Sequence, residues 1–264
     1  MSATIAPDLD DLDEIFREKY GPVDDLGWSP KLRRNFGYFT PDEWYEAIVS
    51  KLVNEKTCWL DVGCGRSLFP DNPRLALRLS QQCQRLVGLD PDPTLQQNPY
   101  VHEKIQGTID QYDDGRQFDL VTMRMVAEHV ADPQAVVKGL LRLTRPGSWI
   151  VIYTIYRWSP VPMLTRLIPF SLHHPIKRLL WRTEAKDTFP VAYKMNTRES
   201  LRRLFVQQGF VEALFAYLDD CRTFARFRAS HYMELMAQRW LHARGLHYPE
   251  VCLLAVYQRG PVER

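Results

Sequence analysis

The chain has 264 residues, of which 45% are hydrophobic and 25% are charged. These proportions are typical of globular proteins, so they exclude general disorder, and the length suffices for one α/β domain with accessory segments. The 34 basic and 32 acidic residues leave a formal net charge of +2, which by itself gives no support to nucleic-acid binding.

Residues 1–56 are expected to form an N-terminal segment with helical and aromatic parts. Residues 1–40 make a polar lead-in with an aromatic cluster at positions 28–39. Thr40, Pro41 and Glu43 have the pattern of a capped helix start, and apolar residues at helical spacing continue to Leu52.

Strands and helices alternate over residues 57–156. Apolar runs predict strands at residues 58–62, 85–89, 118–125 and 149–155, and apolar periodicity predicts helices at residues 74–83 and 132–143. Apolar strands separated by helices indicate a parallel sheet that is covered on both faces.

This alternation stops at residues 157–195, a proline-rich insertion with short apolar pieces and many basic residues. Regular structure resumes in residues 196–264, the C-terminal part of the same α/β domain. Asn196 and Glu199 predict a capped helix that ends at Gly209. A strand at 210–218, a helix at 224–244 and a final strand at 251–258 are expected to follow.

The cysteines and the hydropathy indicate the cellular compartment of the protein. Five cysteines without a C-x-x-C pair argue against a disulfide framework or a zinc site, so a reducing cytosol is the simplest setting. The acidic N-terminus does not resemble a secretory signal, and no apolar run approaches the roughly 20 residues that span a bilayer. We therefore expect a soluble, cytoplasmic protein.

The run Asp61-Val62-Gly63-Cys64-Gly65 lies where a predicted strand meets a helix. Glycine allows the backbone to turn sharply there and to approach a ligand closely. Asp90 ends the next strand, and a carboxylate in that position can accept hydrogen bonds from both hydroxyls of an adenosine ribose. A strand, glycine turn, helix, strand and acid in this order indicate a nucleoside site.

Two cofactor classes compete for this site. The dinucleotide fingerprint G-x-G-x-x-G needs a third glycine, but Leu68 stands at that position. Asp61 precedes the first glycine, and this acid would repel a pyrophosphate but attract an ammonium group. The pattern therefore favours S-adenosyl-L-methionine over NAD.

Residues 57–156, the expected cofactor-binding core, resemble the class I methyltransferase domain, in the branch of the ubiquinone and menaquinone biosynthesis methyltransferases. The ordered motifs that carry the resemblance are Leu60-Asp61-Val62-Gly63-Cys64-Gly65, Leu89-Asp90, Phe118-Asp119-Leu120-Val121, Glu128-His129-Val130-Ala131-Asp132-Pro133 and Leu143-Thr144-Arg145-Pro146-Gly147. The resemblance implies a Rossmann-like α/β fold, with a seven-stranded, mostly parallel sheet, helices on both faces and an antiparallel last strand. The final two strands would be formed near residues 210–218 and 250–258.

The resemblance also implies a cofactor site at the ends of several strands. The residues so implied are Asp61, Gly63, Cys64 and Gly65 at the methionine end, Asp90 and Pro91 at the ribose, Thr108 and Ile109 at the adenine ring, and Arg124 through its backbone. Many family members have an acidic residue where Thr108 stands, so the contact with the adenine amino group differs here.

His129 and Glu128 follow the fourth strand, on the side expected for the acceptor. His129 is the candidate general base because histidine titrates near neutrality, although it could instead cap or pack the next helix. Methyl transfer needs little acid–base help, since the sulfonium is already a strong electrophile. Glu128 could hold an acceptor or cofactor group, or be a solvated acid at a helix start.

Substrate contacts are expected from both flanking segments. Tyr38 could close over the cofactor as an aromatic lid, or simply pack the N-terminal helix on the sheet. Arg157 and His173 belong to the basic and apolar insertion, which could dock an acidic acceptor, rest on a membrane surface, or be a packed cover. His173 and His174 lack further ligands at metal spacing, so no metal site is expected.

These patterns predict methyl transfer to an oxygen, nitrogen or carbon atom of a small organic acceptor by a monomer or a homodimer. Two other classes remain open at this point: a methyltransferase-like binding or regulatory protein without catalysis, and a nucleotide-dependent oxidoreductase. Nucleic acid is not expected as a substrate, because the charge is nearly balanced and no Asn/Asp-Pro-Pro-Tyr motif is present.

Overall fold

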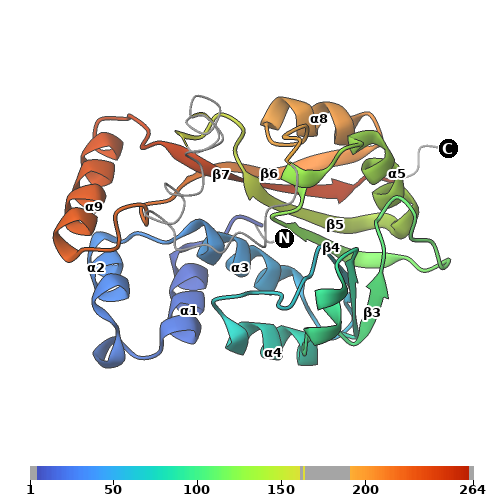
Figure 1. Cartoon of the computed structure of the whole chain (residues 1–264), viewed down its shortest axis with the longest axis horizontal. Helices are drawn as coiled ribbons and strands as arrows, with labels where there is room; N and C mark the ends of the chain where they lie inside the picture. Colours follow the sequence, from blue (N-terminus) through green and yellow to red (C-terminus); the bar gives the residue numbers. More distant parts are fainter. Residues whose placement is uncertain (1–4, 161–162, 164–190, 262–264) are drawn as a thin grey trace.

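A seven-stranded sheet forms the centre of the molecule (Figure 1). The computed structural model describes residues 5–160, 163 and 191–261. The strands are β1 (Cys58–Val62), β2 (Arg85–Asp90), β3 (Glu103–Gln106), β4 (Phe118–Arg124), β5 (Thr144–Ile155), β6 (Phe210–Asp219) and β7 (Glu250–Arg259). Their order is β3-β2-β1-β4-β5-β7-β6, in which β7 pairs antiparallel with both β5 and β6 and the other pairings are parallel. The predicted Rossmann-like sheet with an antiparallel last strand is confirmed.

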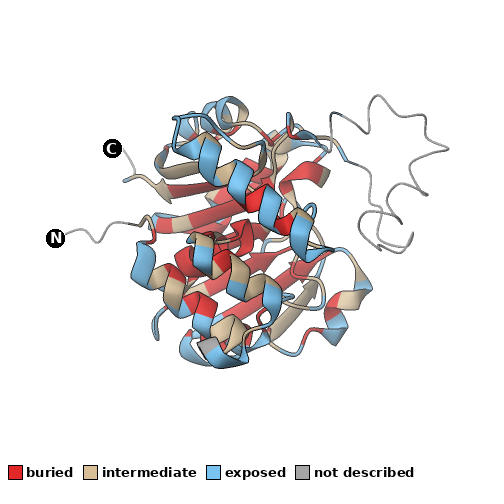
Figure 2. Ribbon diagram, turned by 90° about the vertical axis from the view of Figure 1, so that its left-hand side faces the viewer, coloured by how far each residue is buried: buried red, intermediate tan, exposed pale blue. Residues whose placement is uncertain are grey.

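Helices cover both faces of this sheet, and the buried residues form a separate core on each face (Figure 2). One core joins the sheet to α1 (Leu9–Tyr20), α3 (Pro41–Leu52) and α4 (Pro73–Gln82). The other joins it to α5 (Pro133–Leu143) and α8 (Arg198–Val206). Because strand side chains alternate between faces, Trp59 packs in the first core and Leu60 in the second. Asp61 therefore faces the same side as α3.

The helix starts follow the expected capping chemistry. Thr40 accepts a hydrogen bond from the Glu43 backbone N–H, the Glu43 carboxylate accepts one from the Thr40 N–H, and Pro41 is the first residue of α3. Asn72 and Asp132 cap α4 and α5 in a similar way, and each is followed by a proline. The caps of α3 and α5 each satisfy two backbone N–H donors, and the cap of α4 satisfies one.

The N-terminal lead-in and one predicted cap differ from the expectation. Residues 1–40 are not simply a polar lead-in, since they contain α1 and α2 (Trp28–Phe36), and α1 buries Leu12, Ile15 and Phe16. The cap of α8 is Thr197, paired with Ser200, rather than Asn196, because the Asn196 side chain is used to hold β5.

The last helix and the insertion complete the fold. The predicted helix at 224–244 is shorter, since α9 covers Arg228–His242, and it lies beside α2 at one end of the molecule (Figure 1). Most of the insertion at 157–195 lies outside the described residues. Among the helices that the structure describes, none is long and apolar enough to cross a membrane.

Candidate functional site at the carboxyl edge of the sheet

The strand directions bring the predicted site residues to one edge of the sheet. Since β1, β2, β4, β5 and β6 run in the same direction, their carboxyl ends lie together, whereas β7 ends at the opposite edge. Asp61, Asp90, Arg124 and Arg157 each stand at or just after one of these ends. In open α/β sheets the crevice outside this edge is where ligands bind.

The turn after β1 requires both of its glycines. Gly63 has φ of +71°, and its N–H donates to the Leu89 carbonyl over 2.7 Å, which ties the turn to the end of β2. A Cβ at this position would lie 2.2 Å from Cγ2 of Val126. Gly65 also has a positive φ, of +44°. The turn is therefore a bare stretch of backbone that a ligand can approach closely.

Asp90 holds this turn in place. Its Oδ2 accepts a hydrogen bond from the Gly65 N–H and its Oδ1 accepts one from the Asp92 N–H, both over 2.8 Å, and the residue is buried. A carboxylate offers about four lone-pair positions, so about two remain for other donors. The carboxylate can thus order the turn and still accept ribose hydroxyls.

Asn98 fixes the same turn from the other side, and sequence reasoning missed it. Its Nδ2 donates to the carbonyls of Cys64 and Gly65, each over 3.2 Å, and the residue is completely buried. The Cys64 side chain packs inward over β2, where a Cβ on Gly88 would lie 2.7 Å from Sγ. Burial raises the pKa of the Cys64 thiol, which fits a packing role, so a ligand would meet the backbone of Cys64 rather than its sulfur.

Asp61 is a buried carboxylate with a neutral hydrogen-bond partner. The parallel register pairs Asp61 with Thr122, whose hydroxyl donates to Oδ1 over 2.5 Å and accepts from the Trp59 indole N–H over 2.7 Å. Burial raises the pKa of Asp61 to about 7; the Thr122 hydrogen bond and Arg124 oppose this rise, and Asp90 adds to it. A cation that binds beside Asp61 would stabilise its ionised form.

The segment after β3 provides an unpaired polar atom. Within the described ranges, Oγ1 of Thr108 is buried without a hydrogen-bond partner, whereas Ile109 packs in the core. A Cβ on Gly139 would lie 2.4 Å from the Ile109 carbonyl oxygen, so α5 holds this backbone tightly. Pro91 is exposed, and its carbonyl accepts a hydrogen bond from Gln106.

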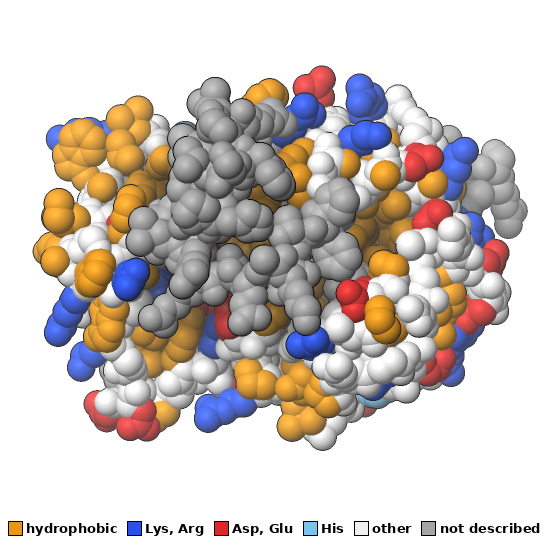
Figure 3. All heavy atoms as spheres, in the orientation of Figure 1, with side chains coloured by type: hydrophobic (Ala, Val, Ile, Leu, Met, Phe, Trp, Pro, Cys, Tyr) orange, Lys and Arg blue, Asp and Glu red, His pale blue; other side chains and the backbone are white. Residues whose placement is uncertain are grey.

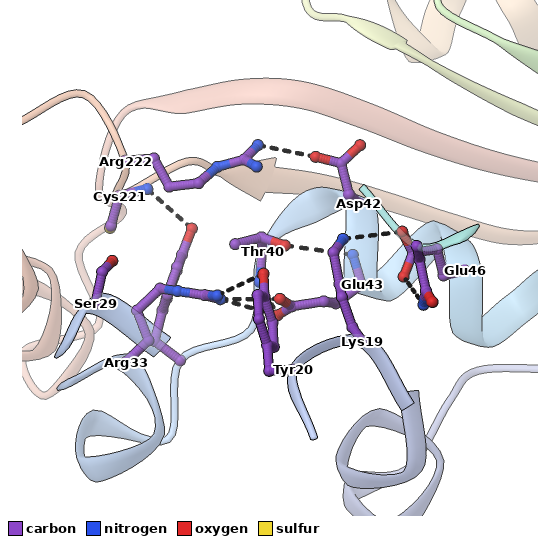
Figure 4. A network of polar contacts seen from close by, with 12 residues as sticks. Lys19, Tyr20, Ser29, Arg33, Thr40, Asp42, Glu43, Glu46, Cys221 and Arg222 are labelled. Carbon is purple, nitrogen blue, oxygen red and sulfur yellow. Dashed lines mark hydrogen bonds and ion pairs between the residues drawn. The ribbon is translucent and has the colours of Figure 1, made fainter. Parts of the chain in front are cut away.

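Arg124 takes part in an ion-pair cluster that joins three segments. It donates to Oδ1 of Asp42 on α3 over 2.8 Å. Arg222, which follows β6, donates to Oδ2 of the same carboxylate over 2.9 Å, as Figure 4 shows. Burial would raise the pKa of Asp42, but the two arginines outweigh it and lower the pKa to about 2. The next residue, Met125, has φ of +52°, a conformation that is rare outside glycine. The side chain of Arg124 is therefore committed to protein contacts, which leaves the backbone for a ligand.

Further polar contacts join the N-terminal helices to one another and to this edge (Figure 4). Arg33 donates to both carboxylate oxygens of Glu43 over 3.0 Å and to the Tyr20 hydroxyl over 2.8 Å. The Tyr38 hydroxyl donates to the Asp219 carbonyl over 2.9 Å and accepts from the Cys221 N–H over 2.8 Å. These contacts of Tyr38 favour the packing interpretation over the lid.

Glu128 is not a solvated acid, because it is buried. Its Oε2 accepts a hydrogen bond from the Thr154 hydroxyl over 2.5 Å, and its backbone carbonyl accepts from Ala192 and Tyr193. Asn196 donates to the same Thr154 oxygen over 2.8 Å. Glu128 therefore connects the loop after β4 to β5 and to the chain that returns from the insertion.

Of the other residues predicted to contact the acceptor, the structure describes His129 and Arg157 but not His173. His129 lies half-exposed at the end of the 3-10 turn η3 (Ala127–His129), beside Glu128. Arg157 donates to the Tyr193 carbonyl over 3.5 Å and lies over the Trp158 ring. His173 lies outside the described residues, so its predicted role is not addressed.

In the described ranges, neither the surface hollow at α1 and α4 nor any metal-binding cluster gives a second candidate site that contains the predicted residues. A hollow of about 710 Å³ is lined by Asp10, Glu14, Arg17, Glu18 and Arg78, charged residues of α1 and α4, and contains none of the predicted site residues. No three His, Cys, Asp or Glu side chains gather in these ranges in a way that could hold a metal ion.

Comparison with known proteins identifies the family of the chain. The model of a methyltransferase domain family matches residues 32–212. Ubiquinone biosynthesis O-methyltransferases from Bordetella avium and Leptothrix cholodnii are 27% identical over 135 residues and 29% identical over 136 residues. These alignments cover 48% and 47% of this chain and 53% and 54% of the relatives. The chain thus spans about half the length of the curated relatives it matches.

Solved structures share the fold. A putative S-adenosylmethionine-dependent methyltransferase from Listeria monocytogenes is 14% identical with a TM-score of 0.51, over 83% of this chain and 99% of that one. A putative methyltransferase from Haloferax volcanii, in complex with the Trm112 activator, is 17% identical with a TM-score of 0.51, over 88% and 94% of the chains. Identities this low speak for the fold alone.

Proposed function

Because the chain belongs to the methyltransferase domain family, of the class I type that uses S-adenosylmethionine, we propose that it transfers the methyl group of this cofactor to an oxygen, nitrogen or carbon atom of a small organic acceptor. The observation that carries the proposal is the environment of Asp61. This carboxylate is buried at the glycine turn, and the hydrogen bond it accepts comes from the neutral hydroxyl of Thr122. The ammonium group of S-adenosylmethionine would supply the countercharge that a buried carboxylate needs.

The residues at the carboxyl edge fit the other parts of the cofactor. Gly63 and Gly65 leave the backbone open to close approach by the methionine end. The remaining lone pairs of Asp90 suit the two ribose hydroxyls, and the unpaired Oγ1 of Thr108 suits a polar edge of the adenine ring. When bound, the cofactor supplies a methyl group on a positively charged sulfur, ready for in-line attack.

The chain's own part in the reaction is to position the acceptor and manage its proton. An acceptor atom must lie about 3 Å from the methyl carbon along the line of the breaking bond, and fixing that geometry supplies much of the rate. His129 is the proposed general base for an acceptor that must lose a proton, since it lies half-exposed beside the edge. Arg157 remains the proposed contact for an acceptor with an acidic group.

Calorimetry with S-adenosylhomocysteine tests the cofactor assignment. We expect Asp90→Asn to weaken binding by at least about 100-fold, because charge-assisted hydrogen bonds to two hydroxyls contribute roughly 1.5 to 3 kcal/mol each. Asp110→Asn is the matched control, an exposed carboxylate in the segment after β3, and it should bind as the unchanged protein does. Unchanged affinity in a folded Asp90→Asn protein would refute the ribose assignment.

Turnover separates an enzyme from a binding protein of the same fold. Incubation with S-adenosylmethionine and a panel of small hydroxylated, amino and activated-carbon acceptors should yield S-adenosylhomocysteine for one acceptor class. Tight cofactor binding with no turnover in any class would favour the regulatory alternative. A titration with NADH should give no fluorescence response.

A further inference from the structure

The surface around α9 exposes an unusual number of large apolar side chains. Seven of them lie in residues 224–246 with at least 45% of their surface exposed: Phe224, Phe227, Tyr232, Met233, Met236, Trp240 and Leu246. Trp28 of the neighbouring α2 adds another at 40%. An exposed apolar cluster of this kind marks an interaction site, in contrast to single exposed apolar residues.

Three of these side chains form an apolar stripe on the helix. Met233, Met236 and Trp240 recur at spacings of three and four residues, so they lie on one face of α9. The opposite face is packed, since His231 and Leu235 are completely buried and the Trp28 ring meets the His231 ring edge-on at 5.9 Å. The exposed stripe is therefore outside the helix's packing with α2.

Within residues 221–249 the acidic side chain is buried, whereas four of the arginines are exposed, so the exposed arginines leave a positive surface. Residues 221–249 contain five arginines and a single acidic residue, Glu234. Glu234 is buried and accepts hydrogen bonds from the Phe224 N–H and the Tyr248 hydroxyl. Two of the exposed arginines lie against exposed aromatic rings of this segment: Arg226 against Phe227 and Arg244 against Trp240. Figure 3 shows apolar and basic side chains intermingled at the end of the molecule where α9 lies.

We propose that this surface, formed by residues 224–246 together with Trp28, docks the protein on an anionic lipid surface. Aromatic residues enter the boundary between headgroups and acyl chains, and arginines pair with anionic headgroups, as in interfacial amphipathic helices. Residues 224–246 follow the family match at 32–212 and Trp28 precedes it, so this surface lies outside the matched residues. It also differs from the predicted insertion, which ends at residue 195.

The charge pattern argues against a second copy of the chain as the occupant. A two-fold interface brings the same patch of both subunits together. Arg226, Arg228, Arg239 and Arg244 of both subunits would then be gathered in one interface, and no carboxylate between residues 221 and 249 is exposed to pair with them. An anionic membrane supplies the opposite charge at every position along the helix.

Flotation of the full chain with lipid vesicles tests this proposal. We expect binding to vesicles of phosphatidylcholine with phosphatidylglycerol, little binding to phosphatidylcholine alone, and loss of binding as salt rises from about 0.1 M to about 1 M. Arg226→Gln with Arg228→Gln should weaken binding roughly 25-fold, about fivefold for each arginine. Phe227→Glu with Met233→Glu should abolish it.

Matched controls keep these outcomes specific to the surface. Leu77→Glu alters an apolar residue of α4 that is 51% exposed, and Arg74→Gln with Arg202→Gln removes two exposed arginines of α4 and α8. Both controls should float as the unchanged protein does, and all variants should retain affinity for S-adenosylhomocysteine. The proposal is overturned if the unchanged protein binds neither vesicle, or if the controls lose binding as much as the α9 variants do. It is also overturned if sedimentation shows a dimer that Phe227→Glu with Met233→Glu dissociates.

Discussion

The buried charge of Asp61 should make both the stability of the protein and its affinity for the cofactor depend on pH. The informative change is Asp61→Asn, which keeps the shape of the side chain and an oxygen that can accept the Thr122 hydrogen bond. Asp110→Asn, on an exposed residue, serves as its control. The free energy of unfolding is measured with urea at a series of pH values, without cofactor.

The magnitude follows from the pKa of the carboxyl. Burial raises the pKa of Asp61 from 3.8 to about 7. The nearby charge of Asp90 adds to this rise, whereas the Thr122 hydrogen bond and the charge of Arg124 reduce it. The folded protein therefore holds this proton more tightly than the unfolded chain does, and stability falls as pH rises from about 4 to about 7. The full loss, on the order of 4 kcal/mol, is present above about pH 7. Asp61→Asn should be more stable than the unchanged protein by up to that amount at pH 8, and the difference should vanish near pH 4.

Cofactor binding should show the opposite dependence. An ammonium group beside Asp61 favours the ionised carboxylate, so binding releases a proton below about pH 7. Affinity for S-adenosylhomocysteine should then fall about tenfold for each pH unit below 7, or about 100-fold at pH 5. Asp61→Asn should bind weakly at every pH. The reasoning is wrong if the unchanged protein binds equally well at pH 5 and pH 7, or if Asp61→Asn gains no stability at pH 8.

Two further substitutions test the turn and the ion-pair cluster. Gly63→Ala should destabilise the protein by at least about 2 kcal/mol and weaken cofactor binding, because it strains a positive φ and places Cβ against Val126. Gly115→Ala, with φ of +76° and open space around it, should cost only about 1 kcal/mol; equal losses would contradict the clash. Asp42→Asn should cost about 2 kcal/mol at pH 7, since its pKa is held near 2. That cost should disappear as pH falls from about 4 to about 2, and a cost that persists in acid would exclude the ion pairs as its source.

The core of the fold could be predicted because its signals are local. β1 is a short apolar run with Asp61 next to its last residue, β2 is one that ends in Asp90, and the capping pattern of Thr40 is complete within four residues. The seven-stranded sheet with an antiparallel last strand came from the resemblance rather than from periodicity, and the order of the strands was not predicted, since apolar runs do not specify their neighbours.

The helices α1 and α2 were not predicted because their signals are weak in the sequence. The inward face of α1 consists mainly of Leu12, Ile15 and Phe16, within a strongly polar stretch. Ion pairs with distant residues also connect α1 to the rest of the fold, such as the one between Lys19 and Glu46, whose side chains are almost completely buried. A pair separated by 27 residues leaves no local pattern to read.

The supporting residues of the site were missed for the same reason. Thr122 lies beside Asp61 only because β4 pairs with β1 in one particular register. Asn98 reaches the glycine turn from a loop more than 30 residues away, and asparagine in a proline-rich loop usually indicates a turn. The carboxylates that would contact the cofactor could therefore be predicted from sequence, whereas the groups that orient them required the three-dimensional structure.

A crystal structure of the chain with S-adenosylhomocysteine is the most direct measurement of where the cofactor binds. We predict that the ligand lies at the carboxyl edge of the sheet, with its amino group within hydrogen-bond distance of Asp61 and its ribose hydroxyls within that distance of Asp90. A ligand bound elsewhere on the chain, or bound at this edge without contact to either carboxylate, would contradict the assignment.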